Sequence, residues 1–123
     1  MIALDSFGWI ERLTNGPKAT KYNKVIDQTR HENIITSVVV LYEVYRKVKK
    51  LKGELIALES IAGLTQTKLV PIDQTLALEA ADYNLEYSLH FSDALVYATA
   101  RHFNSDLYTS DQHFKGLPFV KLI

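Results

Sequence analysis

Short runs of apolar residues alternate along this chain with longer segments in which apolar residues recur every three or four positions. The short runs are typical of buried strands, and the longer segments are typical of helices with one apolar face. The expected strands are residues 1–4, 33–36, 68–72, 107–109 and 119–122. The expected helices are residues 7–13, 17–31, 38–51, 54–65, 74–85 and 93–103.

This alternation predicts a three-layer α/β/α fold, in which helices cover both faces of a mostly parallel sheet. Pro71 places the third strand at an edge, because proline cannot donate to a strand ladder. The β-branched run 38–40 leaves the second boundary open, since these residues could also extend the strand. In such a sheet, a site is expected beyond the carboxyl ends of the strands.

Four residues stand directly before segments of helical periodicity and are predicted to cap them. They are Ser6, Ser37, Asp73 and Ser92. Each has a side-chain oxygen that can accept a hydrogen bond from the free backbone N–H groups of the first helical turn.

The composition indicates one soluble domain, residues 1–123, with 47% apolar and 23% charged residues. The absence of cysteine excludes a disulfide scaffold and fits a reducing cytoplasm. Asp5 comes too early for a signal peptide. The longest uncharged candidate, residues 34–42, is shorter than the roughly 18 residues that span a bilayer, so no membrane association is expected.

Fourteen basic and fourteen acidic residues give a formal net charge of zero. Any nucleic-acid binding must therefore use a local basic patch. One candidate patch follows Glu43 and contains Arg46, Lys47, Lys49 and Lys50. A second contains Lys18, Lys21 and Lys24. The alternative is that both are ordinary solvated helix faces.

The segment 91–111 carries the first candidate chemistry. Residues 94–100 contain no charge, which predicts a buried helix, and residues 107–109 predict a short buried strand. Asp93 opens this helix and Asp111 directly follows this strand. Taken singly, each acid also fits a structural role, Asp93 at the positive end of a helix and Asp111 in a turn.

Asp5 and Asp111 each follow a strand, so they meet in one crevice with Asp93 if the first and fourth strands are neighbours. Glu43 joins them if its helix packs across the first strand. The alternative for Glu43 is an exposed ion pair with Lys47, four residues along the helix.

Four clustered carboxylates repel one another, and the sequence near Asp5, Asp93 and Asp111 offers no fixed Arg or Lys. Oxygen ligands without thiolate or imidazole predict Mg²⁺ or Mn²⁺. Such clusters activate water and stabilise charge at phosphorus, as in nucleases. Hydroxyl groups beside the acids could orient a carboxylate or a water, or could cap the adjacent helices. These are Ser6, Thr109 and Ser110.

These motifs, in this order and spacing, resemble those of the PIN-domain ribonucleases, and most closely the VapC-like toxins of bacterial and archaeal toxin–antitoxin pairs. The resemblance covers essentially the whole chain. The matching motifs are residues 4–6 (Leu-Asp-Ser), Ser37 with residues 42–44 (Tyr-Glu-Val), 92–95 (Ser-Asp-Ala-Leu), 98–100 (Ala-Thr-Ala) and 107–111 (Leu-Tyr-Thr-Ser-Asp) with His113 and Phe114.

The resemblance implies a PIN-like fold with strand order 3-2-1-4-5 and endonucleolytic cleavage of single-stranded RNA. It implies that four acids hold Mg²⁺ or Mn²⁺, and by position these are Asp5, Glu43, Asp93 and Asp111. It also implies a homodimer and a cognate antitoxin whose apolar segment covers grooves on the helices. Trp9 and Leu13 are candidate antitoxin contacts, although Trp9 equally fits a core position.

Two other functions fit parts of the pattern. A phospho-accepting receiver domain shares the strand–helix alternation, but it needs paired acids after the first strand and a Lys near the end of the fourth or fifth, and both are missing. A catalytically silent PIN-like module that acts through protein or RNA binding would be indicated by the loss of one of the four acids. All four are present.

Overall fold

The computed structural model describes all 123 residues and contains a five-stranded parallel sheet with the strand order β3-β2-β1-β4-β5. This confirms the predicted order, and the sheet proves to be parallel throughout. The strands are β1 (Ile2–Leu4), β2 (Ile34–Ser37), β3 (Lys68–Val70), β4 (Asp106–Thr109) and β5 (Val120–Leu122). As Pro71 indicated, β3 lies at an edge.

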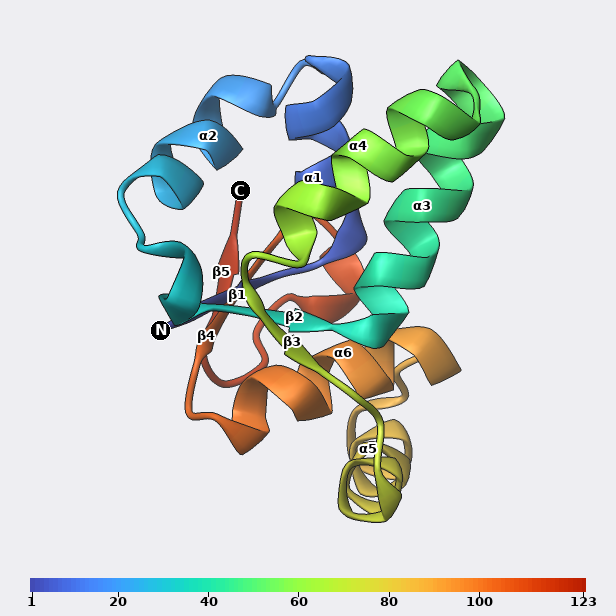
Figure 1. Cartoon of the computed structure of the whole chain (residues 1–123). Coiled ribbons are helices and arrows are strands. Elements are labelled where there is room, and N and C mark those ends of the chain that lie inside the picture. The colour runs from blue at the N-terminus through green and yellow to red at the C-terminus, as the bar shows by residue number, and fades with distance from the viewer.

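Helices cover both faces of the sheet (Figure 1). They are α1 (Ser6–Thr14), α2 (Ala19–Asp27), α3 (Val38–Lys52), α4 (Glu54–Leu64), α5 (Gln74–Tyr87) and α6 (Phe91–His102), with two 3-10 turns, η1 (His31–Asn33) and η2 (Gln112–Phe114). The first four helices lie to one side of the sheet and the last two to the other, which gives the predicted three layers. None of the six combines the length and the apolar character that crossing a bilayer requires.

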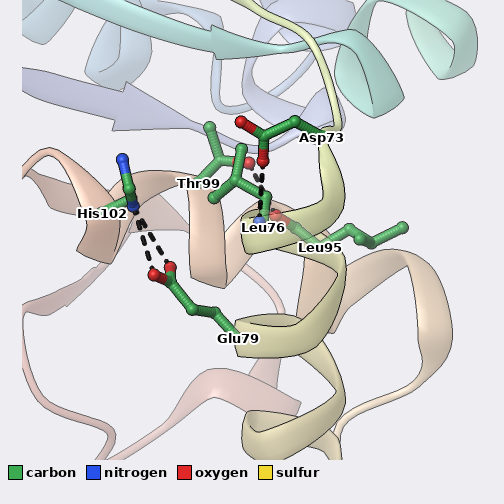
Figure 2. Close-up of polar contacts among 6 residues, drawn as sticks. All are labelled: Asp73, Leu76, Glu79, Leu95, Thr99 and His102. Carbon is green, nitrogen blue, oxygen red and sulfur yellow. Dashed lines mark hydrogen bonds and ion pairs between the residues drawn. The ribbon is translucent and has the colours of Figure 1, made fainter.

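The core is built around β1, β2 and α6. Every residue of α6 from Ala94 to Ala100 is buried, as its uncharged sequence predicted, and the helix packs against β2 and β4. Outside it lies α5, which is joined to α6 by a hydrogen bond between His102 Nδ1 and Glu79 Oε2 at 3.3 Å (Figure 2). The acid-bearing start of α6 is thus held on a buried, rigid element.

Two of the four predicted helix caps are present and two are not. Ser37 accepts from Val39 N at 3.1 Å, and Asp73 accepts from Leu76 N at 2.9 Å (Figure 2). The prediction for Ser6 was wrong, because Asp5 caps α1 and Ser6 is already helical. The prediction for Ser92 was also wrong, because α6 begins two residues earlier than expected, at Phe91, and its N-cap residue His90 makes no side-chain cap.

Some element boundaries also differ from the sequence prediction, and one boundary that the sequence left open is resolved. Helix α2 ends at Asp27 instead of near residue 31, because Ile26 is the last buried apolar residue before β2. The open question at residues 38–40 resolves in favour of the helix, since Ser37 caps it and Val40 packs in the core. Strand β3 ends at Val70, just before Pro71.

Candidate metal and active site

The carboxyl ends of β1 and β4 place two of the predicted acids side by side. The two strands pair in parallel, with Leu4 opposite Tyr108, and the backbone N–H of Asp5 donates to the Tyr108 carbonyl at 3.4 Å. Asp5 and Asp111 therefore leave the sheet at the same edge. This is the condition on which the predicted crevice depended.

All four predicted acids line one cleft of about 460 Å³ at this edge. Helix α1 packs against α3, which brings Glu43 to the cleft, and the first turn of α6 brings Asp93. Asp5 is buried, and the other three acids are less enclosed. The lining residues are Asp5, Ser6, Phe7, Lys18, Glu43, Asp93, Val96, Ser110 and Asp111.

Asp5 is the most enclosed of the acids and is held at both carboxylate oxygens. Its Oδ1 accepts from Gly8 N at 3.3 Å, and its Oδ2 accepts from the Thr109 hydroxyl. That hydroxyl in turn accepts from Asp111 N at 3.0 Å. Burial raises the pKa of Asp5 from its ordinary 3.8 to about 6, the two hydrogen bonds lower it, and the charges of Asp111 and Asp93 raise it further.

Glu43 points into the cleft and forms no ion pair with Lys47, so the exposed-pair alternative was wrong. Burial raises its pKa above the ordinary value, a hydrogen bond with the Ser6 side chain lowers it, and the charge of Asp93 raises it again. Ser6 therefore serves a carboxylate, which was one of its two predicted roles.

Asp93 and Asp111 face each other with two histidines beside them. Burial raises the pKa of Asp93, the charge of Asp111 raises it further, and His90 and His113 lower it. The Asp111 carboxylate caps η2 by accepting from His113 N at 2.9 Å, and its Oδ1 lies 3.0 Å from His113 Nδ1.

The predicted ligand set contained only carboxylates, and the structure adds an imidazole beside them. Ligand atoms of Asp93, Asp111 and His113 all lie within 4.8 Å of one another, which makes these three the tightest potential metal-binding set, without Asp5 or Glu43. The turn η2 causes this by folding His113 back onto Asp111. The signal in the sequence was the two-residue spacing between the two side chains.

The remaining predicted residues divide between the site and its surroundings. Ser110 lines the cleft and its hydroxyl lies 2.7 Å from that of Tyr22, whereas Thr109 is fully buried behind Asp5. Arg46 and Lys47 line an adjoining hollow of about 330 Å³ together with Glu43. Lys49 and Lys50 do not line it, and Lys49 pairs instead with Glu54 at 3.6 Å.

The PIN domain family model matches residues 2–120. The chain belongs to the PIN domain family. This confirms the family inferred from the sequence motifs. A search of curated proteins finds no match.

Solved structures with the same fold span nearly the whole of this PIN domain. A toxin–antitoxin complex from Klebsiella pneumoniae matches with a TM-score of 0.84 and 23% identity over 98% of this chain and 96% of the other. VapC20 of Mycobacterium tuberculosis, described as a toxin that cleaves the sarcin–ricin loop, matches with a TM-score of 0.81 and 17% identity, over 99% and 98%. VapBC2 from Rickettsia felis, bound to promoter DNA, matches with a TM-score of 0.74 and 18% identity, over 100% of this chain and 98% of the other.

The donor atoms of this PIN domain fit a divalent cation. Asp5, Glu43 and Asp93 all have raised pKa values, mainly because burial disfavours their charge. No Lys or Arg forms an ion pair with any of the four acids. A cation in the cleft would supply the missing positive charge, and the carboxylates and imidazole of the site are ligands that such an ion accepts.

Proposed function

We propose that this chain is a metal-dependent endoribonuclease that cleaves single-stranded RNA, and that it is the toxin of a toxin–antitoxin pair acting in the cytoplasm. One observation carries the proposal. The four acids Asp5, Glu43, Asp93 and Asp111 line a single cleft at the carboxyl edge of the sheet of a PIN domain. The proposed role as a toxin is supported by the structural neighbours, whose names describe toxins and toxin–antitoxin complexes.

The four carboxylates would hold Mg²⁺ or Mn²⁺, with His113 next to Asp93 and Asp111. When bound, the cation supplies charge that activates the attacking water and stabilises the phosphodiester as it gains negative charge. Thr109 fixes the orientation of the Asp5 carboxylate, and Ser6 does the same for Glu43. The hollow beside Glu43, with Arg46 and Lys47, would receive the RNA backbone, because phosphate contacts supply most nonspecific affinity.

The direct test is cleavage of a single-stranded RNA oligonucleotide. The purified protein is expected to cut it with Mg²⁺ or Mn²⁺ and to stop when EDTA is added. Replacement of Asp5, Asp93 or Asp111 by Ala is expected to abolish cleavage. Undiminished cleavage in EDTA would disprove the metal mechanism.

The control variant for this test is Asp82→Ala, which removes an acid of α5 outside the cleft and should retain full activity. Asp73→Ala is a second control with a different outcome. It should retain activity and melt earlier, because Asp73 caps α5 (Figure 2) and losing a cap costs about 1 kcal/mol. If Asp73 proved as necessary for cleavage as Asp93, the assignment of the acids would fail.

Two apolar surfaces could receive the proposed protein partners, and they lie on opposite sides of the sheet. On one side, Trp9 and Leu13 line a small hollow between α1, α2 and α4, and Leu55 in the first turn of α4 is exposed. Trp9 is mostly buried, but its indole N–H has no acceptor.

On the other side, an apolar groove of about 320 Å³ runs between α5 and α6. Phe91 lines it and is 81% exposed, and Leu85 of α5 is 82% exposed. A second copy of the chain would bury these side chains, which supports the homodimer.

A further inference from the structure

Lys18 is the only positively charged side chain that lines the acid cleft. It lies directly before α2, and its Nζ reaches Ile123, which follows the carboxyl end of β5. In the sequence it belonged to a run of basic residues with Lys21 and Lys24, but those two do not line the cleft. The fold therefore separates Lys18 from its neighbours.

The position of Lys18 is fixed at both its backbone and its side chain. Its backbone N–H donates to Oε1 of the buried Glu11 at 3.0 Å. Its Nζ donates to the main-chain oxygen of Ile123, 105 residues further along the chain, at 2.9 Å. An ammonium group has three N–H donors, so two remain available to a ligand in the cleft.

The acids of the cleft do not use this charge. Lys18 forms no ion pair with an Asp or Glu side chain, in contrast to Lys49 with Glu54. The ammonium group thus lines the same cleft as the carboxylates without pairing with any of them, and the donors that Ile123 leaves unused can meet an anion.

We propose that Lys18 binds a backbone phosphate of the RNA adjacent to the phosphate that is cleaved. The cleaved phosphate must lie at the acids, where the chemistry takes place, so a contact with the separate ammonium group falls on a neighbouring phosphate. This inference rests on the proposed nuclease function and makes the substrate more specific, namely a strand with a charged phosphate beside the cut. Lysine suits this role because it binds phosphate as a point charge.

The first experiment compares wild type, Lys18→Met and Lys18→Arg on one RNA oligonucleotide. Met keeps most of the side-chain length and removes the charge, whereas Arg restores it. Lys18→Met is expected to raise KM about tenfold with a much smaller change in kcat, the size of one hydrogen bond to a charged group. Lys18→Arg should restore KM to near the wild-type value. Lys115→Met, which removes an exposed lysine outside the cleft, is the matched control.

The second experiment locates the contact on the RNA. Each non-scissile phosphate is replaced in turn by an uncharged methylphosphonate. In the wild type one position next to the cut should raise KM, and in Lys18→Met the same replacement should have no further effect, because both changes remove the same contact. If every position behaves alike in the two proteins, or if Lys115→Met matches Lys18→Met, the proposal is wrong.

Two measurements distinguish a failure of the Lys18 contact from a folding defect and from a failure of the proposed nuclease function. Thermal melts show whether Lys18→Met is folded, and a folding defect that Lys18→Arg does not restore would make Lys18 a structural residue only. RNA binding is measured with Ca²⁺ in place of Mg²⁺ or Mn²⁺, so that affinity is read without turnover. A wild type that binds RNA through Lys18 but never cleaves it would disprove the nuclease and leave the Lys18 contact standing.

Discussion

Asp5 combines two roles that usually belong to different residues. It caps α1 through Gly8 and is also one of the four acids of the cleft. Its carboxylate is hydrogen-bonded at both oxygens, and yet its pKa is raised to about 6, because the cost of burying the charge exceeds the gain from the two bonds. The metal-free protein therefore holds a charge at neutral pH that destabilises its fold.

Asp5→Asn is expected to stabilise the metal-free protein at neutral pH while abolishing cleavage. A rise of about two pKa units corresponds to about 3 kcal/mol lost when Asp5 ionises in the folded state. Asn recovers this, but it has one acceptor oxygen where Asp has two. If that oxygen keeps the bond from Gly8 N, the Thr109 hydroxyl proton loses its acceptor, which costs about 1 kcal/mol. The expected net gain is about 1–2 kcal/mol, measured by thermal or urea unfolding in EDTA at about pH 7.5.

The pH dependence gives the sign of this effect. The pKa of Asp5 is higher in the folded state than in the unfolded state. Its contribution to the free energy of unfolding is therefore fully present below about pH 3.8 and is lost as the pH rises through about 6. The advantage of Asn should therefore vanish in acid. Mg²⁺ should stabilise the wild type more than the variant. A metal-free Asp5→Asn protein that melts well below wild type at neutral pH would show that capping, not charge burial, dominates at this position.

At the scale of elements, α3 presents two surfaces to a bound RNA. One turn carries Glu43 into the cleft, the next places Arg46 and Lys47 in the adjoining hollow, and the last turn directs Lys49 towards Tyr45 and Glu54. The basic run that follows Glu43 in the sequence is thus divided by the helix into residues beside the site and residues away from it.

Replacing both Arg46 and Lys47 by Ala should weaken RNA binding and reduce the slope of log K against log salt by about 1.4, because each phosphate that a side chain neutralises on a single strand contributes about 0.7. The double variant Lys49→Ala with Lys50→Ala should change the slope much less, since neither residue lines the hollow. The measurement is fluorescence anisotropy with Ca²⁺ over a range of salt concentrations. If the two double variants had equal effects, the basic residues after Glu43 would be an ordinary solvated helix face and not an RNA-binding surface.

Most elements were predictable because their local patterns agree with the tertiary structure. The uncharged run in α6 marked a buried helix, and Ser37 and Asp73 marked two helix starts. The wrong predictions arose where contacts between distant residues decide which of several residues caps a helix or lines the cleft. Asp5 and Ser6 are both good caps, and only the packing of β4 and Thr109 shows which one caps α1. The position of Lys18 likewise depends on Glu11 and Ile123, which no local window includes.

For the whole molecule, the two exposed apolar surfaces predict separable effects of surface substitutions. Leu85→Asp, on the α5 side, should convert a dimer to a monomer in sedimentation velocity while leaving the circular dichroism spectrum unchanged, because Leu85 is exposed in the single chain. Leu55→Asp, on α4 at the other side of the sheet, is the matched control and should remain dimeric. Dimers in both variants, or a monomeric wild type, would rule out the α5 side as the contact between copies.

The link between Asp5 and Thr109 also bears on when the protein can become active during its synthesis. The two residues are 104 positions apart, and at about 5–20 residues per second the ribosome needs about 5–20 seconds to make the chain between them. Until β4 has emerged, β1 lacks its neighbour on one side, and neither Asp111 nor the main-chain oxygen that holds Lys18 exists. A partly made chain therefore has no complete acid cleft, and the ribosome that is making it is not exposed to a working nuclease from the same nascent chain.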